Sequence, residues 1–106
     1  MMMLLEMRVK DKIIEALKQV HDPEIPVNIY DLGLIYSIEP KIGNHVDITM
    51  TLTNMGCPVA GYLVESVEMA AKSVDGIETA YVDLVFDPPW DKNMLSEAAK
   101  LELGIL

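Results

Sequence analysis

The chain has 106 residues, of which 51% are hydrophobic, so a single domain spanning residues 1–106 can bury a core without disulfides or a structural metal. The net charge of −9 argues against nucleic acid and anionic membrane surfaces as partners. Cys57 is the only cysteine, which excludes an internal disulfide and any four-thiolate zinc or cluster site within one chain.

The chain opens with a short apolar run, Met1–Leu5, which is followed by mixed charge rather than by a cleavage site of small residues. This pattern does not fit a signal peptide. No apolar run approaches the ~18 residues expected of a membrane span. Because a lone thiol also fits a reducing compartment, the sequence predicts a cytoplasmic protein.

Apolar residues then recur at helical spacing and predict an amphipathic helix over roughly residues 6–21. The members of this stripe are Val9, Ile13, Ile14, Leu17 and Val20. Pro23 and Pro26 end the helix, because proline supplies no N–H and disfavours helix in the preceding residue. The following stretch, residues 22–33, is predicted to be an ordered loop.

Two strands follow, over residues 34–39 and 45–53, joined by a turn at residues 41–44. In the second strand, apolar residues alternate with Asp47, Thr49, Thr51 and Thr53. Such alternation predicts one buried face and one wet face, with the threonines on the wet face.

A loop over residues 54–58 leads into a second helix, whose apolar stripe runs from Val59 to Val74. Asp75 and Gly76 end that helix, and a third strand is predicted over residues 79–86. A last helix is predicted over residues 96–103, with Ser96 as its N-cap and Gly104 at its C-terminal stop.

The predicted order of elements is therefore α-β-β-α-β-α. This order indicates an α+β fold, a two-layer sandwich on a three-stranded sheet. The helical connection makes the second and third strands parallel, so the sheet is predicted to be mixed.

Cys57 is the leading candidate for a metal ligand. Pro58 is favoured at the first position of a helix, which places Cys57 at or next to the N-cap. Unpaired backbone N–H groups and the helix dipole favour an anion there, so this placement lowers the pKa of the thiol and favours the thiolate that binds metals. Gly56 permits a tight turn and close approach of a ligand. The alternative is that Cys57 is a small buried hydrophobe, the commoner fate of a free cysteine.

The other candidate pocket residues lie near the predicted strand ends. Asp31 is the best placed of the acids to face the Cys57 loop, whereas Asp22 and Asp87 precede prolines and are better explained as turn initiators. The remaining candidates are Thr53, Asn54, Gly56 and Pro58.

Other motifs are absent or ambiguous. His21 and His45 lack metal-ligand spacing, and no catalytic motif stands out, so no catalytic residue is assigned and no enzyme is expected. Trp90 is expected to pack, with partner contact as the alternative.

Three blocks of the sequence resemble the PaaD/SufT-type family of metal–sulfur cluster biosynthesis proteins, also described as iron–sulfur cluster assembly domains. The first block is residues 22–36, from Asp-Pro-Glu-Ile-Pro to Gly-Leu-Ile-Tyr. The second is Met50–Thr53 followed by Gly56–Pro58, and the third is Val85–Trp90 followed by Met94, Ser96, Leu103 and Gly104.

The resemblance implies a role in the assembly, transfer or targeting of iron–sulfur clusters. It makes Cys57 the reactive cysteine and places Asp22, Asp31 and Asp87 at the family's acidic motif positions. It also implies scaffold proteins, a carrier ATPase and apo-client proteins as partners. With one cysteine, no cluster is stably bound by a monomer, so further ligands would come from a second subunit, a thiol cofactor or a client.

Three hypotheses follow from these residues. In the first, a non-enzymatic factor binds iron or a cluster transiently through Cys57 and transfers it, with a homodimer as an attractive way to join two thiolates. In the second, the protein is an adaptor that binds no metal and recruits apo-proteins to the assembly machinery. In the third, Cys57 is a catalytic nucleophile, for which no general base is evident nearby in the sequence.

Overall fold

The computed structural model describes residues 2–23, 25–53 and 60–104, with side chains described from residue 8 onward in these ranges. The elements in chain order are α1 (Met2–Leu17), β1 (Ile35–Lys41), β2 (His45–Met50), α2 (Ala60–Lys72), β3 (Thr79–Leu84), the 3₁₀ helix η1 (Lys92–Met94) and α3 (Glu97–Glu102). The predicted α-β-β-α-β-α order is confirmed, with η1 as an addition.

The three strands form one sheet in the order β1-β2-β3. Strand β1 pairs antiparallel with β2, and β2 pairs parallel with β3, so the predicted mixed sheet is also confirmed. Parallel neighbours need a crossover connection, and here that connection contains α2.

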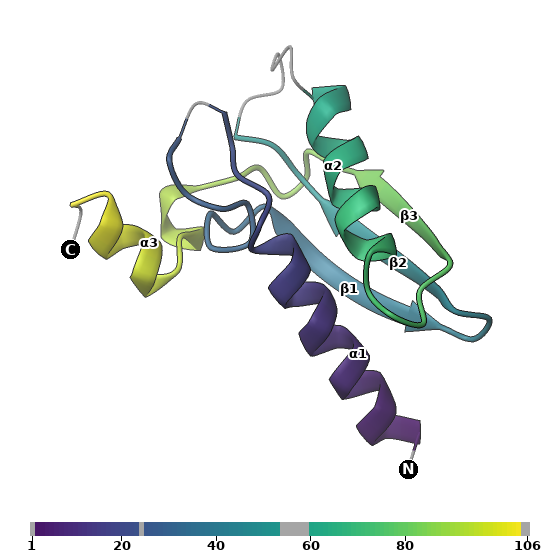
Figure 1. Cartoon of the computed structure of the whole chain (residues 1–106). Helices are drawn as coiled ribbons and strands as arrows, with labels where there is room; N and C mark the ends of the chain where they lie inside the picture. The colour runs from purple at the N-terminus through teal and green to yellow at the C-terminus, as the bar shows by residue number, and fades with distance from the viewer. Residues whose placement is uncertain (1, 24, 54–59, 105–106) are drawn as a thin grey trace.

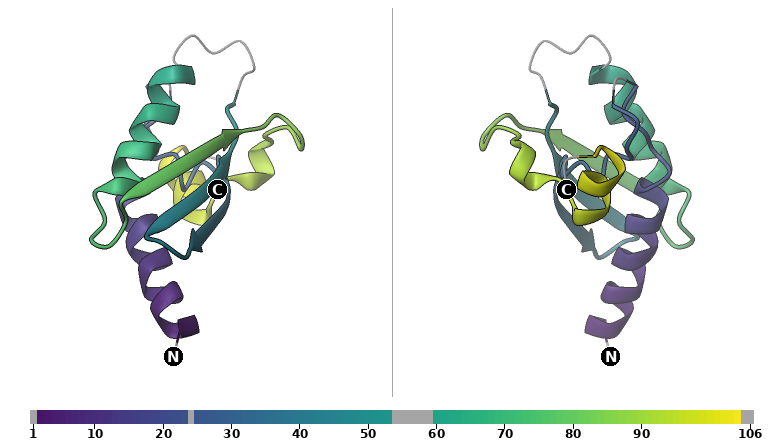
Figure 2. Two further views of the ribbon diagram at one scale, coloured as in Figure 1. Left: turned by 90° about the vertical axis from the view of Figure 1, so that its right-hand side faces the viewer. Right: turned by 90° about the vertical axis from the view of Figure 1, so that its left-hand side faces the viewer.

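Helices α1 and α2 lie side by side on one face of the sheet (Figures 1 and 2). The alternating residues Val46, Ile48 and Met50 of β2 are buried, and so are Leu63 and Val67 of α2. The apolar stripe of α2 therefore forms half of a two-layer core, as its helical spacing predicts. The opposite face carries polar side chains, where His45 bonds Asp47 and Thr79 at 2.7 Å each.

Several element boundaries differ from the predicted ones. Helix α1 begins earlier and ends earlier than residues 6–21, because the chain leaves the helix in a turn at Lys18 and Gln19. Strand β2 ends at Met50 rather than at residue 53. The N-cap of α3 is confirmed, since the Ser96 hydroxyl accepts a hydrogen bond from the Ala99 N–H at 3.1 Å.

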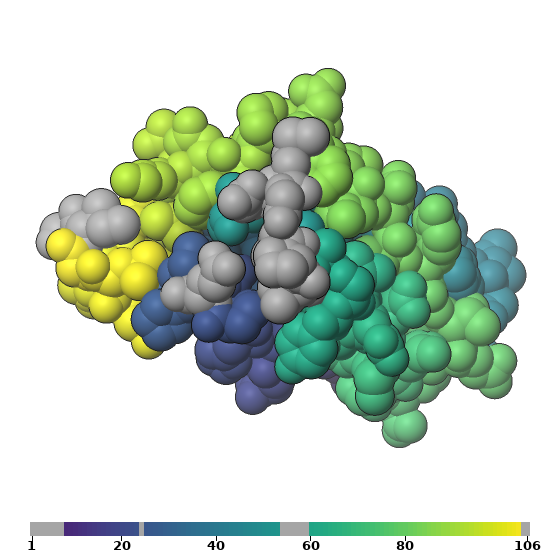
Figure 3. Space-filling view, turned by 90° about the horizontal axis from the view of Figure 1, so that it is seen from above, coloured from purple at the N-terminus to yellow at the C-terminus, as the bar shows by residue number. Residues whose placement is uncertain are grey.

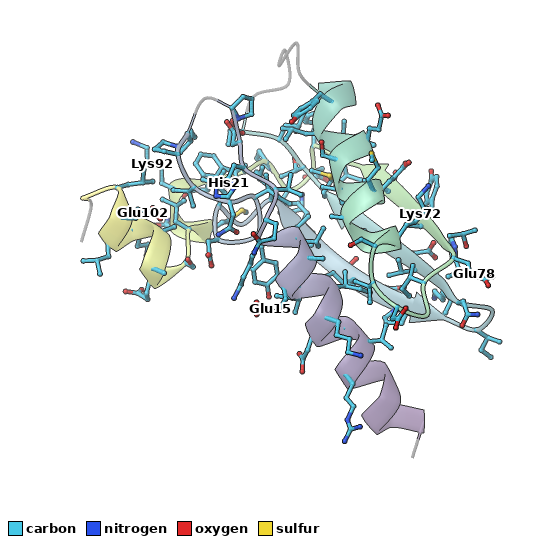
Figure 4. The ribbon with its side chains drawn as sticks, in the orientation of Figure 1. Glu15, His21, Lys72, Glu78, Lys92 and Glu102 are labelled. Carbon is cyan, nitrogen blue, oxygen red and sulfur yellow. The ribbon has the colours of Figure 1, made fainter. Side chains whose placement is uncertain are left out.

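The two ends of the sheet are built differently. At one end, here called the turn end, residues 42–44 connect β1 to β2 and β3 begins at Thr79. Gly43 and Asn44 have positive φ angles of 92° and 59°, as a tight turn requires. Glu78, labelled in Figure 4, lies at this end and donates its backbone N–H to the Asn44 carbonyl at 2.8 Å.

Candidate functional site

The opposite end of the sheet, here called the loop end, is where the described site candidates Asp22, Asp31, Thr53 and Asp87 lie, in the segments that leave the sheet. Ile35 at the start of β1, Met50 at the end of β2 and Leu84 at the end of β3 are in register across the sheet. The segments before β1, after β2 and after β3 therefore leave the sheet at the same place. Figure 3 views this end from above, with the segment before β1, the segment after β3 and α3 lying side by side.

Asp22 acts within the segment between α1 and β1. Its side chain is buried, and its Oδ1 accepts a hydrogen bond from the Ile25 N–H at 3.1 Å. Its own N–H bonds the Val27 carbonyl at 3.3 Å. This arrangement agrees with the interpretation of the Asp-Pro pair as a turn initiator. His21, just before it (Figure 4), is exposed, with Nδ1 3.3 Å from the Gln19 carbonyl.

Asp31 forms a reciprocal pair with Asn28, a residue that the sequence interpretation missed. The Asn28 amide donates to Asp31 Oδ2 at 2.7 Å, and the Asp31 N–H donates to Asn28 Oδ1 at 2.9 Å. The Asp31 carbonyl also accepts the Ser96 N–H at 2.8 Å. Asp31 thus holds its own loop and joins it to the start of α3. The signal that could have found Asn28 is the three-residue spacing typical of local Asn and Asp turns.

The segment after β3 is clamped against the same loop by two further contacts. The Trp90 indole N–H donates to the Leu32 carbonyl at 2.6 Å, which agrees with the expectation that Trp90 packs. Gly33 has a φ of 83°, and a Cβ there would overlap the Met94 carbonyl oxygen. Glycine at position 33 is therefore required both by the backbone conformation and by the close approach of Met94.

Tyr36 and Asp87 lie at the outer part of this clamp. The Tyr36 hydroxyl donates to the Pro88 carbonyl at 2.7 Å and contacts the Met94 sulfur at 3.7 Å. Asp87 is exposed and precedes Pro88 through a cis peptide bond. Tyr36 therefore ties β1 to the segment that carries Asp87.

The threonines at the end of β2 differ from their predicted exposure. Thr53 is half-buried, but Thr51 is 0% exposed, so its placement on a wet face is wrong. The alternation rule fails there because Thr51 lies past the end of β2, where its N–H bonds the Leu34 carbonyl at 2.8 Å among converging segments. The Thr51 hydroxyl has no hydrogen-bond partner among the described residues.

The remaining predicted site residues, Asn54, Gly56, Cys57 and Pro58, lie outside the described residues. Thr53 and Ala60 are the described residues on either side of them. In the ranges 8–23, 25–53 and 60–104, no group of three or more His, Cys, Asp or Glu side chains could hold a metal ion. Asp22, Asp31 and Asp87 thus share the loop end without forming a metal-binding group.

A comparison of the sequence with models of known protein families identifies the family of this chain. The model of the family described as "Iron-sulfur cluster assembly protein" matches residues 10–84. The chain belongs to this family. The family resemblance is thereby confirmed, with the first two sequence blocks inside the matched residues and the third, from Val85 onward, beyond them.

Individual relatives match almost the whole chain. A protein of Porphyromonas gingivalis, named "Fe-S protein maturation auxiliary factor", is 47% identical over 94% of this chain and 95% of its own length. SufT of Staphylococcus aureus, with the same description, is 36% identical over 81% of this chain and 98% of its own.

A solved structure also superimposes closely. It is a domain of unknown function, DUF59, from Bacillus anthracis, with a TM-score of 0.89 and 36% identity. The match covers 97% of this chain and 98% of that chain. Separately, none of the described helices is long and apolar enough to cross a membrane.

Proposed function

We propose that this protein is an iron–sulfur protein maturation factor that takes up iron or a cluster transiently through Cys57 and passes it on by ligand exchange. The observation that carries the proposal is the full-length similarity to a relative named as a maturation auxiliary factor. The factor is not an enzyme in this proposal, because the transfer exchanges ligands and needs no catalytic residue.

The loop end supplies the setting for this chemistry. Cys57 lies four residues after Thr53 and three before Ala60, the first described residue of α2. A helix N-terminus favours an anion, so a thiolate next to α2 is stabilised by the helix dipole. The contacts of Trp90, Gly33 and Asp31 hold together the described segments at this end of the sheet, the end at which β2 stops before the stretch of sequence that carries Cys57.

The other ligands in this proposal come from outside the chain. One cysteine, and no metal-binding group among the described side chains, leave the coordination of iron incomplete. A second subunit, a thiol cofactor or a client protein completes it. Incomplete coordination suits a transfer protein, because the metal must be released as well as held.

The proposed partners and location follow from the same chemistry. Scaffold proteins and a carrier ATPase deliver the iron or cluster, and apo-proteins receive it. A thiol that must remain reduced to work places the activity in the cytoplasm.

The adaptor hypothesis remains the second candidate, and one observation favours it. Tyr62 and Met69 on α2 are 64% and 63% exposed, although both are large hydrophobic side chains. They lie seven residues apart and hence on one side of the helix. An apolar surface of this kind fits contact with a client protein without any metal.

Anaerobic reconstitution with iron and sulfide tests the carrier proposal. We expect the wild type to gain iron, sulfide and visible absorbance, and Cys57→Ala to lose nearly all of them. Ser73→Ala, at an exposed residue directly after α2, is the matched control and should load like the wild type.

The same variants separate the carrier from the adaptor. Equal iron content in wild type and Cys57→Ala would overturn the carrier proposal. If Cys57→Ala also matured a client as well as the wild type, while Tyr62→Ser or Met69→Ser lost the client, the adaptor would replace it. Sedimentation of the loaded protein then shows whether two thiolates meet in a homodimer.

A further inference from the structure

The two edge strands of the sheet, β1 and β3, differ in their protection against pairing with another chain. Edge strands expose backbone N–H and C=O groups, and proteins guard such edges with bulges, prolines and charged side chains. Strand β1 has all three: a bulge between residues 35 and 37, followed by Glu39, Pro40 and Lys41. Strand β3 pairs with β2 in a regular register over Thr79–Leu84, and its only charged residue is Asp83. The edge of β3 is therefore the less protected one.

The outer edge of β3 is uncovered in the described parts of the chain. In the left view of Figure 2, β3 is nearest the viewer and no other described element lies in front of it. The N–H groups of Thr79 and Val85 bond the carbonyl oxygens of residues 44 and 50, at 3.3 and 2.8 Å, on the side of β2. Backbone groups alternate in direction along a strand. The residues of β3 that direct their N–H and C=O groups outward are therefore Ala80, Val82 and Leu84.

Exposed apolar side chains lie on both sides of this edge. Helix α2 packs on β3, and α1 lies on the other side of α2 (Figures 1 and 2). Tyr62 and Met69 of α2 are exposed, and helical spacing places them on the flank opposite Val64, which is half-buried. Their flank is thus turned away from α1 and toward the free edge of β3. On the open face of the sheet, Tyr81 of β3 is also exposed.

The charge on this side of the molecule is strongly negative. Residues 60–84, which span α2 and β3, contain one cation, Lys72, against the acids Glu65, Glu68, Asp75, Glu78 and Asp83. Five of the eight Lys and Arg residues lie instead on α1, directly after it, or on β1. All eight are among the described residues, whose ion pairs do not include Glu78 or Asp83. The β3 edge therefore has a carboxylate near each end that is available to a cation.

We propose that the edge of β3 binds an extended basic segment of a partner protein. The segment adds to the sheet as a fourth strand, antiparallel to β3, with apolar side chains beside Tyr62 and Met69. Its cationic side chains lie on Glu78 and Asp83. Backbone hydrogen bonds supply part of the affinity, and the charge selects the partner.

A second copy of this chain is a poorer occupant of the edge. It would bring the same carboxylates and a further net charge of −9, and like charges across an interface oppose association. The proposed surface includes the apolar side chains named above for the adaptor hypothesis. It does not depend on Cys57.

The test uses the whole protein and the acetylated, amidated peptide Ser-Lys-Val-Thr-Val-Thr-Lys-Ser, followed by amide NMR. Its two lysines lie five residues apart, as Glu78 and Asp83 do. We expect saturable shifts at residues 79–84 below about 1 mM peptide, which weaken with added salt. Asp83→Lys should weaken binding about fivefold or more. Asp11→Lys, at an exposed residue of α1, changes the net charge equally and is the matched control, expected to bind within about twofold of the wild type.

Altered peptides examine the mode of binding. With Glu in place of both lysines, the peptide should bind at least about fivefold more weakly. With its lysines on the two carboxylates, an antiparallel strand places its valines opposite Ala80 and Val82. N-methylation of both valines should therefore abolish binding, whereas N-methylation of both threonines should leave it within about threefold. Cys57→Ala should bind the original peptide normally, which keeps this test separate from that of the carrier proposal.

Four outcomes would overturn the inference. The first is the absence of saturable shifts at residues 79–84 with about 5 mM peptide. The second is equal binding by Asp83→Lys and Asp11→Lys, which would leave only an effect of overall charge. The third is equal binding of the two N-methylated peptides, which would exclude strand pairing. The fourth is a dimer without peptide whose amide shifts on dilution fall at residues 79–84, which would show that a second copy of the chain occupies the edge.

Discussion

The turn end and the loop end of the sheet are held by different kinds of contact. At the turn end, a tight three-residue turn joins β1 to β2, and the Asn44 carbonyl accepts the N–H groups of Glu78 and Thr79 at the start of β3. At the loop end, Trp90 bonds the carbonyl of Leu32, a residue 58 positions away in the sequence, and Gly33 lies against the Met94 backbone. The turn end thus combines local turn chemistry with backbone pairing, whereas the loop end depends on close packing between long loop segments.

This difference predicts where substitutions should lower the stability of the fold most. A tight turn can relax toward solvent, so most of its residues tolerate change. The loop end has backbone packed on backbone, and a change there displaces two distant segments together. The described candidate site residues, Asp22, Asp31, Thr53 and Asp87, lie at the less tolerant end.

Alanine substitution of two glycines compares the ends directly. Gly33 and Gly43 both have positive φ angles, 83° and 92°, but only Gly33 faces the Met94 backbone, whereas Gly43 has open space around it. We expect Gly43→Ala to cost about 1–2 kcal/mol from the left-handed backbone alone. Gly33→Ala should cost about 3–5 kcal/mol, since overpacking adds to the same strain. Urea unfolding measures both.

The Gly43→Ala variant serves as the internal control for backbone strain. If the two variants lost the same free energy of unfolding, the Met94 contact would contribute nothing, and the contrast between the two ends would fail.

Removing the indole N–H of Trp90 tests its hydrogen bond to the Leu32 carbonyl. Trp90→Phe keeps an aromatic ring but leaves the Leu32 carbonyl without this donor, so we expect a loss of about 1–2 kcal/mol in the free energy of unfolding. Tyr81→Phe, at a side chain that is 59% exposed on β3, should change it by less than about 0.5 kcal/mol. Thermal or urea unfolding of both variants measures the difference.

An equal effect of Trp90→Phe and Tyr81→Phe would mean that ring packing alone holds Trp90. The loop end would then owe its rigidity to Gly33 and to the Asp31–Ser96 hydrogen bond.

The sequence predicted those features that depend on near neighbours. The α+β order, the mixed sheet, the turn before His45 and the N-cap of Ser96 all follow from periodicity, turn residues or capping chemistry. The turn role of Asp22 was also predictable, because its acceptor contact is with Ile25, three residues along.

Apart from the local pair of Asn28 and Asp31, the features that were missed depend on distant segments. No local pattern indicates that Trp90 donates to Leu32, or that Gly33 lies against Met94. The exposure of Thr51 was wrongly predicted for the same reason, since period-two alternation describes an isolated strand and not the segments that converge beyond its end. The metal-binding role of Cys57 stays a prediction.

The smallest expected change in the free energy of unfolding is that of a substitution at Thr51. This substitution tests whether the Thr51 side chain contributes to the loop end through packing alone. The Thr51 hydroxyl is fully buried and has no partner among the described residues. Thr51→Val keeps the shape of the side chain and removes the oxygen, so the free energy of unfolding should stay within about 0.5 kcal/mol or rise by up to about 1 kcal/mol. Urea unfolding measures it, with Thr49→Val on the half-buried part of β2 as the control. A loss above about 1 kcal/mol for Thr51→Val alone would mean that the hydroxyl is bonded in solution. The loop end would then contain a buried polar contact at Thr51 in addition to its packing.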